Sequence, residues 1–299
     1  MRFGLMINEP KGPDVLGGLR ERIARAAGDG FSSVWMSQIF SLDALTALAV
    51  AGSQVPGIEL GTGVVPTYPR HPAALAQQAL TANAALDGRL VLGIGLSHQI
   101  VIEGMYGYSF DRPARHMREY LSILMPLVRG ENADFEGETL TGKLGLTTPG
   151  PRDMPVLIAA LAPRMLRLAG EVADGTVLWM TGPRTVAEHV APAVTEAARA
   201  AGRPAPRIVC ALPVCVTDDA DAARALAAER FEVYGHLPSY RAVLDREGVA
   251  GPADVAIVGD EDAVSARIEE LAKAGVTDFV ASEYSSGDGR TREFLKSLL

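Results

Sequence analysis

Short apolar runs alternate along this chain with longer segments in which apolar positions recur at helical spacing. Continuous apolar runs are typical of parallel strands that are buried on both faces. Apolar residues that recur every three or four positions predict amphipathic helices. Strands are predicted over Phe3–Ile7, Ser33–Ser37, Ile58–Val65, Arg89–Gly95, Pro155–Ala160, Thr176–Trp179, Arg207–Val216 and Thr277–Ser282. Helices are predicted over Asp14–Ala27, Asp43–Gly52, Ala73–Leu86, Ala114–Val128, Pro163–Ala173, Pro183–Ala201, Asp219–Tyr234 and Arg290–Leu298.

This alternation predicts a single α/β domain over residues 1–299, a (β/α)8 TIM barrel rather than an open sheet. Two insertions, after strands 4 and 7, exceed a minimal connection. Glu131–Thr148 has the pattern of a small hairpin, and Gly235–Asp260 predicts additional helix. Such segments serve either as substrate loops or as decoration of the barrel rim, and the sequence leaves both readings open.

Composition narrows the class of protein. The 299 residues are 48% hydrophobic and 21% charged, with a formal net charge of -8. An acidic chain without a basic cluster is a poor binder of nucleic acid or of anionic membranes. We expect neither a signal peptide nor a membrane span. Cys210 and Cys215 are predicted to face opposite sides of one strand, so we expect no disulfide and a cytoplasmic protein.

The chemistry of a barrel enzyme gathers at the carboxyl ends of its strands. Strand 3 ends in Gly61-Thr62-Gly63-Val64-Val65-Pro66, and glycine inside a strand often marks a bulge or a close approach by a ligand. Strand 5 ends in Ala160-Leu161-Ala162, and Pro163 begins the next helix. The N–H groups of Arg164 and Met165 then form a candidate anion site. Without further information, each motif also fits an ordinary βα loop.

Three segments give these motifs a more specific meaning. "GTGVVPTYPRHPAALAQQA", "AALAPRMLRLAGEVADGTVLW" and "EELAKAGVTDFVAS" resemble the luciferase-like monooxygenase superfamily, and most of all its members that use the deazaflavin coenzyme F420. The resemblance implies a non-proline cis peptide at Gly63–Val64, under the middle ring of the cofactor, with Val65 beside it. It also implies that phosphate binds at residues 160–165. The family usually has glycine where this chain has Ala162.

Other strand ends supply candidate residues for the same site. Ser97 and His98 follow strand 4, and His98 is a candidate proton donor because its ordinary pKa is near neutrality. Gln38 follows strand 2, where family members often carry an acid or a histidine. Trp179, Thr181 and Gly182 follow strand 6 and are candidates for contacts with the cofactor. In the second insertion, His236, Tyr240 and Arg241 are candidates for shaping the substrate pocket.

We therefore expect a coenzyme F420-dependent oxidoreductase that transfers a hydride to or from an unidentified small molecule. An FMN-dependent monooxygenase on the same barrel is an alternative. A flavin- or deazaflavin-binding protein without turnover is another, because Ser37 and Gln38 provide no clear acid or base. A barrel without any cofactor is a third alternative. The histidines show no metal-binding spacing, and there is no phosphate-binding loop or nucleophile elbow. A homodimer is possible by resemblance to the family.

Overall fold

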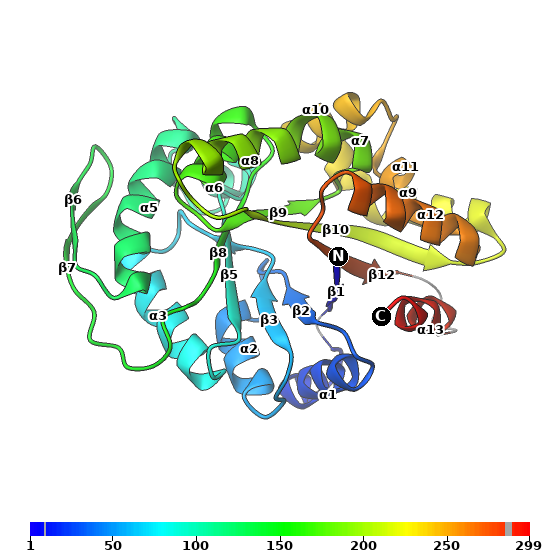
Figure 1. Ribbon diagram of the computed structural model, residues 1–299, viewed down its shortest axis with the longest axis horizontal. Coiled ribbons are helices and arrows are strands. Elements are labelled where there is room, and N and C mark those ends of the chain that lie inside the picture. Colours follow the sequence, from blue (N-terminus) through cyan, green and yellow to red (C-terminus); the bar gives the residue numbers. More distant parts are fainter. Residues whose placement is uncertain (9, 285–288) are drawn as a thin grey trace.

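The computed structural model describes residues 1–8, 10–284 and 289–299. Eight parallel strands form a closed ring, because β12 pairs with β1 and β9 pairs with β10 (Figure 1). The ring runs through β1 (Arg2–Met6), β2 (Ser33–Met36), β3 (Glu59–Thr62), β5 (Leu90–Gly95), β8 (Val156–Ala159), β9 (Gly175–Trp179), β10 (Arg207–Val216) and β12 (Asp278–Glu283). The predicted (β/α)8 fold is therefore confirmed.

Helices lie between the strands and around the barrel (Figure 1). They are α1 (Val15–Gly28), α2 (Ala44–Gly52), α3 (Pro72–Ala85), α4 (Gln99–Gly104), α5 (Pro113–Arg129), α6 (Pro163–Glu171), α7 (Pro183–Thr185), α8 (Ala191–Ala200), α9 (Ala220–His236), α10 (Pro238–Glu247), α11 (Pro252–Val255), α12 (Glu261–Lys273) and α13 (Arg290–Ser297). Asp43 and Asp260 begin α2 and α12 by accepting hydrogen bonds from backbone N–H groups of the first turn. None of the helices within the described ranges is long and apolar enough to cross a membrane.

Both insertions contain the predicted structure. In the first, β6 (Ala133–Glu136) and β7 (Thr141–Leu144) form an antiparallel hairpin that extends from the body beside α5 (Figure 1). In the second, α10 and α11 supply the extra helix. The sequence did not predict α4, α12 or the short strand β11 (Ile257–Gly259), which pairs with β10. A π-helical turn (Val186–Val190) interrupts the helix predicted over Pro183–Ala201.

Trp35 fills the inside of the barrel together with valines from several strands. Its side chain is fully buried, and its indole N–H donates to Ser33 Oγ at 2.9 Å. A Cβ atom at Gly61 would lie 2.4 Å from this indole. The close approach that the sequence indicates at Gly61 is therefore made by Trp35, a residue of the neighbouring strand.

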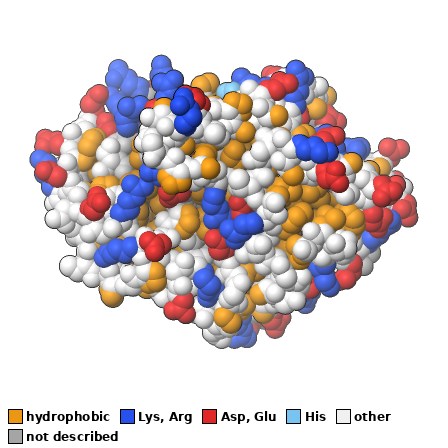
Figure 2. Space-filling model, viewed as in Figure 1, with side chains coloured by type: hydrophobic (Ala, Val, Ile, Leu, Met, Phe, Trp, Pro, Cys, Tyr) orange, Lys and Arg blue, Asp and Glu red, His pale blue; other side chains and the backbone are white. Residues whose placement is uncertain are grey.

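The charges are distributed over the surface and at the amino-terminal end of the barrel. Figure 2 shows acidic and basic side chains mixed over the viewed face of the molecule. Inside the amino-terminal end, the guanidinium of Arg207 donates to Asp278 Oδ1 at 2.6 Å and to Glu59 at 3.2 Å. Asp278 is only 2% exposed, so this network neutralises a buried carboxylate.

Cys210 and Cys215 are both buried on β10, and no disulfide joins these two residues.

Candidate active site

The exit of β3 has the geometry that the sequence predicts. The peptide bond Gly63–Val64 is cis, and it divides the predicted strand into β3 and β4 (Val65–Pro66). The N–H of Gly63 donates to the carbonyl of Met36 on β2 at 2.8 Å. Val64 packs against β5, because a Cβ atom at Gly95 would lie 2.6 Å from Val64 Cγ2. The predicted cis peptide is thus confirmed, and Gly95 provides the space beside it.

The exit of β5 carries Ser97 and His98. Ser97 has a φ of 61°, which is uncommon for a residue other than glycine and occurs often at functional sites. His98 precedes α4, and its ring centroid lies 5.7 Å from that of Tyr240 on α10. Burial lowers the pKa of His98 below 6.5, so its neutral form is favoured at pH 7. Of the three candidates in the second insertion, Tyr240 reaches this strand end, whereas Arg241 pairs with Asp245 at 2.8 Å and His236 lies near Glu232 at 3.8 Å.

The exit of β8 presents the start of α6 to the surface. Ala160 is buried, Leu161 is partly buried, and Ala162, Pro163 and Arg164 are exposed. The N–H of Met165 donates to the carbonyl of Ala162 at 2.9 Å, so this group is already occupied. Within the described residues, neither the backbone N–H nor the guanidinium of Arg164 has a hydrogen-bond or ion-pair partner. The predicted anion site therefore depends on Arg164 more than on Met165.

At the exit of β9, Thr181 and Gly182, which are predicted to contact the cofactor, have close contacts within the protein. The hydroxyl of Thr181 is buried and donates to the carbonyl of Trp179 at 3.2 Å. A Cβ atom at Gly182 would lie 2.3 Å from the carboxylate of Glu247. That carboxylate accepts the N–H groups of Arg184 and Thr185, at 3.2 and 2.7 Å. Glu247, which lies on α10, thus occupies the start of α7 that an anion would otherwise use.

The loops after β2 and β3 are joined by a hydrogen-bonded network that the sequence did not reveal. Gln38 accepts the N–H of Ala44 at 3.1 Å and donates to Asp43 at 3.3 Å, so its side chain is directed toward α2. Arg70, in the loop after β3, forms an ion pair with Asp43. Burial alone would raise the pKa of Asp43, but hydrogen bonds from Thr46 and Arg70 hold it at about 2. Gln38 and Arg70 therefore position the two loops.

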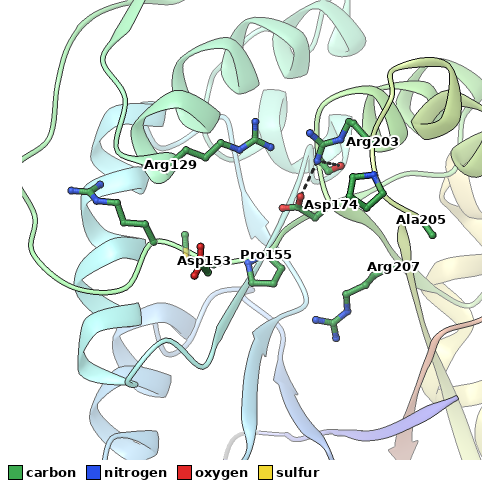
Figure 3. Close-up of a pocket in the computed structure, with 11 residues that line it drawn as sticks. Arg129, Asp153, Pro155, Asp174, Arg203, Ala205 and Arg207 are labelled. Carbon is green, nitrogen blue, oxygen red and sulfur yellow. Dashed lines mark hydrogen bonds and ion pairs between the residues drawn. The ribbon is translucent and has the colours of Figure 1, made fainter.

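A cavity of about 390 Å³ lies at the other end of the barrel, among the segments that lead into β8, β9 and β10. Figure 3 shows Arg129 and Arg203 extending into this region from opposite sides. Arg203 donates to Asp174 at 2.8 Å, and Arg207 belongs to the buried ion-pair network described above. Residues at the amino-terminal end of such barrels serve stability, whereas chemistry takes place at the carboxyl end. The candidate active site is therefore the face that carries Gly63–Val64, His98 and Arg164.

Comparisons with known proteins show the family and the fold of the chain. The family model of luciferase-like monooxygenases matches residues 1–278. A 5,10-methylenetetrahydromethanopterin reductase of Methanolobus tindarius is 29% identical over 285 residues, which cover 86% of this chain and 87% of that protein. An F420-dependent secondary alcohol dehydrogenase, solved with an F420-acetone adduct, superposes with a TM-score of 0.84 at 20% identity over 100% of this chain and 98% of that one. The oxygenating constituent of 3,6-diketocamphane monooxygenase from Pseudomonas putida, in complex with FMN, gives a TM-score of 0.74 at 20% identity over 99% and 95%. At these identities the two structures show the shared fold alone.

Proposed function

We propose that this chain, which belongs to the luciferase-like monooxygenase family, is a coenzyme F420-dependent oxidoreductase acting on a small organic molecule. The observation that carries the proposal is the similarity, along most of the chain, to a 5,10-methylenetetrahydromethanopterin reductase. A solved tetrahydromethanopterin reductase from Methanopyrus kandleri is described as coenzyme F420 dependent. When bound, this coenzyme supplies or accepts a hydride at its planar ring system.

The residues present fit such a group at two places. Gly63, Val64 and Val65 form a compact bulge between β2 and β5 that would support one face of a planar ring. At the exit of β8, the exposed start of α6 and the unpaired Arg164 would hold a phosphate. Thr181 and Gly182 have structural partners, so we assign them no cofactor contact.

Ser97 and His98 would line the edge of the ring where the substrate reacts. Because burial favours the neutral imidazole, His98 is suited to accept the hydroxyl proton of an alcohol while a hydride leaves the carbon that bears the hydroxyl. In the reverse direction His98 would have to be protonated first. The remaining task of the chain is to hold the ring and the substrate at reacting distance.

A titration of the purified protein with coenzyme F420 and, separately, with FMN tests the proposal. We expect F420 to bind more tightly than FMN, and we expect turnover without oxygen consumption. Tight FMN binding without F420 binding would overturn the proposal. The FMN-dependent neighbour makes a monooxygenase the second candidate, which oxygen consumption with reduced FMN would support. Any hydride transfer in a substrate screen would exclude a binding protein without turnover.

A further inference from the structure

Six aromatic rings lie in continuous contact across the carboxyl-terminal end of the barrel, and we call them the aromatic wall. They belong to the ends of β5, β9 and β12 and to the helices α9 and α10. The members of the aromatic wall, in order of contact, are His98, Tyr240, Tyr234, Trp179, Phe231 and Tyr284. Neighbouring ring centroids are 5.0 to 5.9 Å apart, which is the range of favourable ring contacts.

The aromatic wall carries no charge at neutral pH. Burial lowers the pKa of His98 and raises the pKa of Tyr234, Tyr240 and Tyr284, so each side chain stays neutral. Two arginines on α9 and α10 already have acceptors. Arg230 donates to the carbonyl of Tyr284 at 3.2 Å, and Arg241 donates to Asp245 at 2.8 Å. Arg241 is thus neutralised by a carboxylate, and Arg230 is turned toward the carbonyl of Tyr284. A phosphate or carboxylate that packed against His98, Tyr240 and Trp179 would therefore lose water among neutral side chains.

Trp179 brings one hydrogen-bond donor into this apolar surrounding. Its Nε1 atom is buried, and no acceptor lies in hydrogen-bonding geometry among the described residues. The ring of Tyr234 is close, at 5.8 Å between centroids and 68° between planes. The indole N–H lies near enough to the hydroxyl of Tyr234 to lower the pKa of that hydroxyl, but the two groups are not in hydrogen-bonding geometry. A buried N–H without an acceptor costs about 1–3 kcal/mol. A ligand oxygen at this place would remove that cost.

Apolar side chains are also exposed in the two loops that follow β2 and β5. Phe40 is 62% exposed and Tyr106 is 41% exposed, and their ring centroids are 6.5 Å apart. Ile39, Ile100, Met105 and Tyr108 are exposed in the same loops. An exposed apolar patch beside a functional face is typical of a surface that binds an apolar ligand.

We propose that the substrate is an uncharged molecule with an aromatic or polycyclic body, and that Trp179 donates a hydrogen bond to one of its oxygens. The partly exposed members of the aromatic wall, His98, Tyr240, Tyr234 and Trp179, would pack against the body of this molecule, whereas Phe231 and Tyr284 are buried behind them. The oxygen would be a carbonyl or hydroxyl group. This inference rests on the proposed function, since it names the substrate class for the same site. It excludes sugar phosphates and free carboxylic acids as preferred substrates.

Equilibrium dialysis with three probes of one shape tests the substrate class. The probes are 2-acetylnaphthalene, 2-naphthoate and 2-ethylnaphthalene, each measured on the protein with and without bound coenzyme F420. We expect 2-acetylnaphthalene to bind at least about tenfold more tightly than 2-naphthoate, because the carboxylate would be desolvated without a cation. Equal or tighter binding of 2-naphthoate, or of glucose 6-phosphate, would overturn the proposed class.

The variant Trp179→Phe tests the hydrogen bond, because it keeps a ring and removes the donor. We expect it to weaken binding of 2-acetylnaphthalene about tenfold and to change binding of 2-ethylnaphthalene less than about twofold. Tyr120→Phe is the matched control, since it removes another buried group without an acceptor, on α5. An equal loss for both probes in Trp179→Phe would refute the hydrogen bond.

The test of the substrate class can be separated from the test of the proposed function. Thermal unfolding followed by circular dichroism verifies that each variant folds. Failure to bind coenzyme F420 would overturn the proposed function, whereas the probe comparison without coenzyme would still decide the substrate class. Normal F420 binding together with a preference for 2-naphthoate would overturn the substrate class alone.

Discussion

At the end of β5, the largest influence on His98 is its removal from water, which disfavours the charged imidazolium. We expect an NMR titration of the histidine side chains to give His98 a midpoint below 6.5. An oxidation that uses His98 as base should therefore keep its rate until the pH falls through this lowered pKa, and lose it below. The variant His98→Gln identifies the signal, and His236→Gln on α9 is the control. A midpoint at or above 6.5 would contradict the assignment.

Arg164 is the other residue whose role can be measured directly. Its guanidinium has no partner in the described parts of the chain, and it lies at the exposed start of α6. We expect Arg164→Ala to weaken coenzyme F420 binding about tenfold, because a charge-assisted contact to phosphate is lost. Binding of the deazaflavin fragment that lacks the phosphate should not change. Arg167→Ala, on the same helix and also exposed, should leave both affinities at their wild-type values.

Residues of the candidate site differ in how well the sequence predicts them. Gly63 and Val64 were predictable because their conformation follows from a local motif that resembles a family signature. The surroundings of Gly182 were not predictable, because the carboxylate beside it belongs to Glu247, which lies more than 60 positions away in the chain. Met165 was expected to offer a free N–H, but a tight first turn of α6 directs it to Ala162. Partners of backbone groups depend on the packing of distant helices, which a local pattern does not contain.

At the scale of elements, the hairpin β6–β7 depends on one buried carboxylate. Glu119 on α5 is 5% exposed. It accepts the N–H groups of Glu138, Thr139 and Leu140 at 3.1, 2.9 and 3.0 Å. His71, which begins α3, adds a second attachment through the carbonyl of Thr141 at 3.1 Å. The hairpin is therefore anchored to the barrel at two places.

We expect Glu119→Ala to destabilise the protein by about 2 kcal/mol, because it removes a charged acceptor that holds three backbone N–H groups of the hairpin. Urea denaturation measures this, and hydrogen exchange should become faster at residues 138–140. Burial would raise the pKa of Glu119, but its hydrogen bonds lower it below 4.5. The contribution is thus complete above pH 4.5 and disappears as the pH falls through the lowered pKa. Glu136→Ala, in an exposed pair on the hairpin, is the control; an equal loss of stability there would refute the special role of Glu119.

The longest strand was predicted from the sequence, whereas the short elements α4 and β11 and the 13-residue helix α12 were not. The strand over Arg207–Val216 was predicted with the bounds that the structure has, because all but its first residue are buried. By contrast, α4 has six residues, of which Ile102 alone is buried, so it carries no helical repeat. β11 has three residues and exists because it pairs with the far end of β10. Its pairing is a long-range contact that periodicity cannot indicate.

At the scale of the whole molecule, the two ends of the barrel have different tasks. The amino-terminal end contains the buried ion-pair network of Arg207, Asp278, Glu59 and Arg2. The carboxyl-terminal end contains the cis peptide, His98 and the aromatic wall. In (β/α)8 barrels, stability and chemistry are commonly separated in this way. A change in the amino-terminal network should therefore lower the free energy of unfolding but leave the affinity for coenzyme F420 unchanged.

Arg207→Met tests this separation. The substitution removes the closest cation from Asp278, a carboxylate that is 2% exposed. We expect the free energy of unfolding to fall by about 3 kcal/mol, because one charge of a buried network is left behind. The affinity for coenzyme F420 should stay unchanged in the folded variant. Arg199→Met, which breaks an exposed pair with Glu196, should leave both quantities near their wild-type values. A loss of coenzyme affinity in Arg207→Met, at a temperature where the variant is folded, would mean that the two ends of the barrel are coupled.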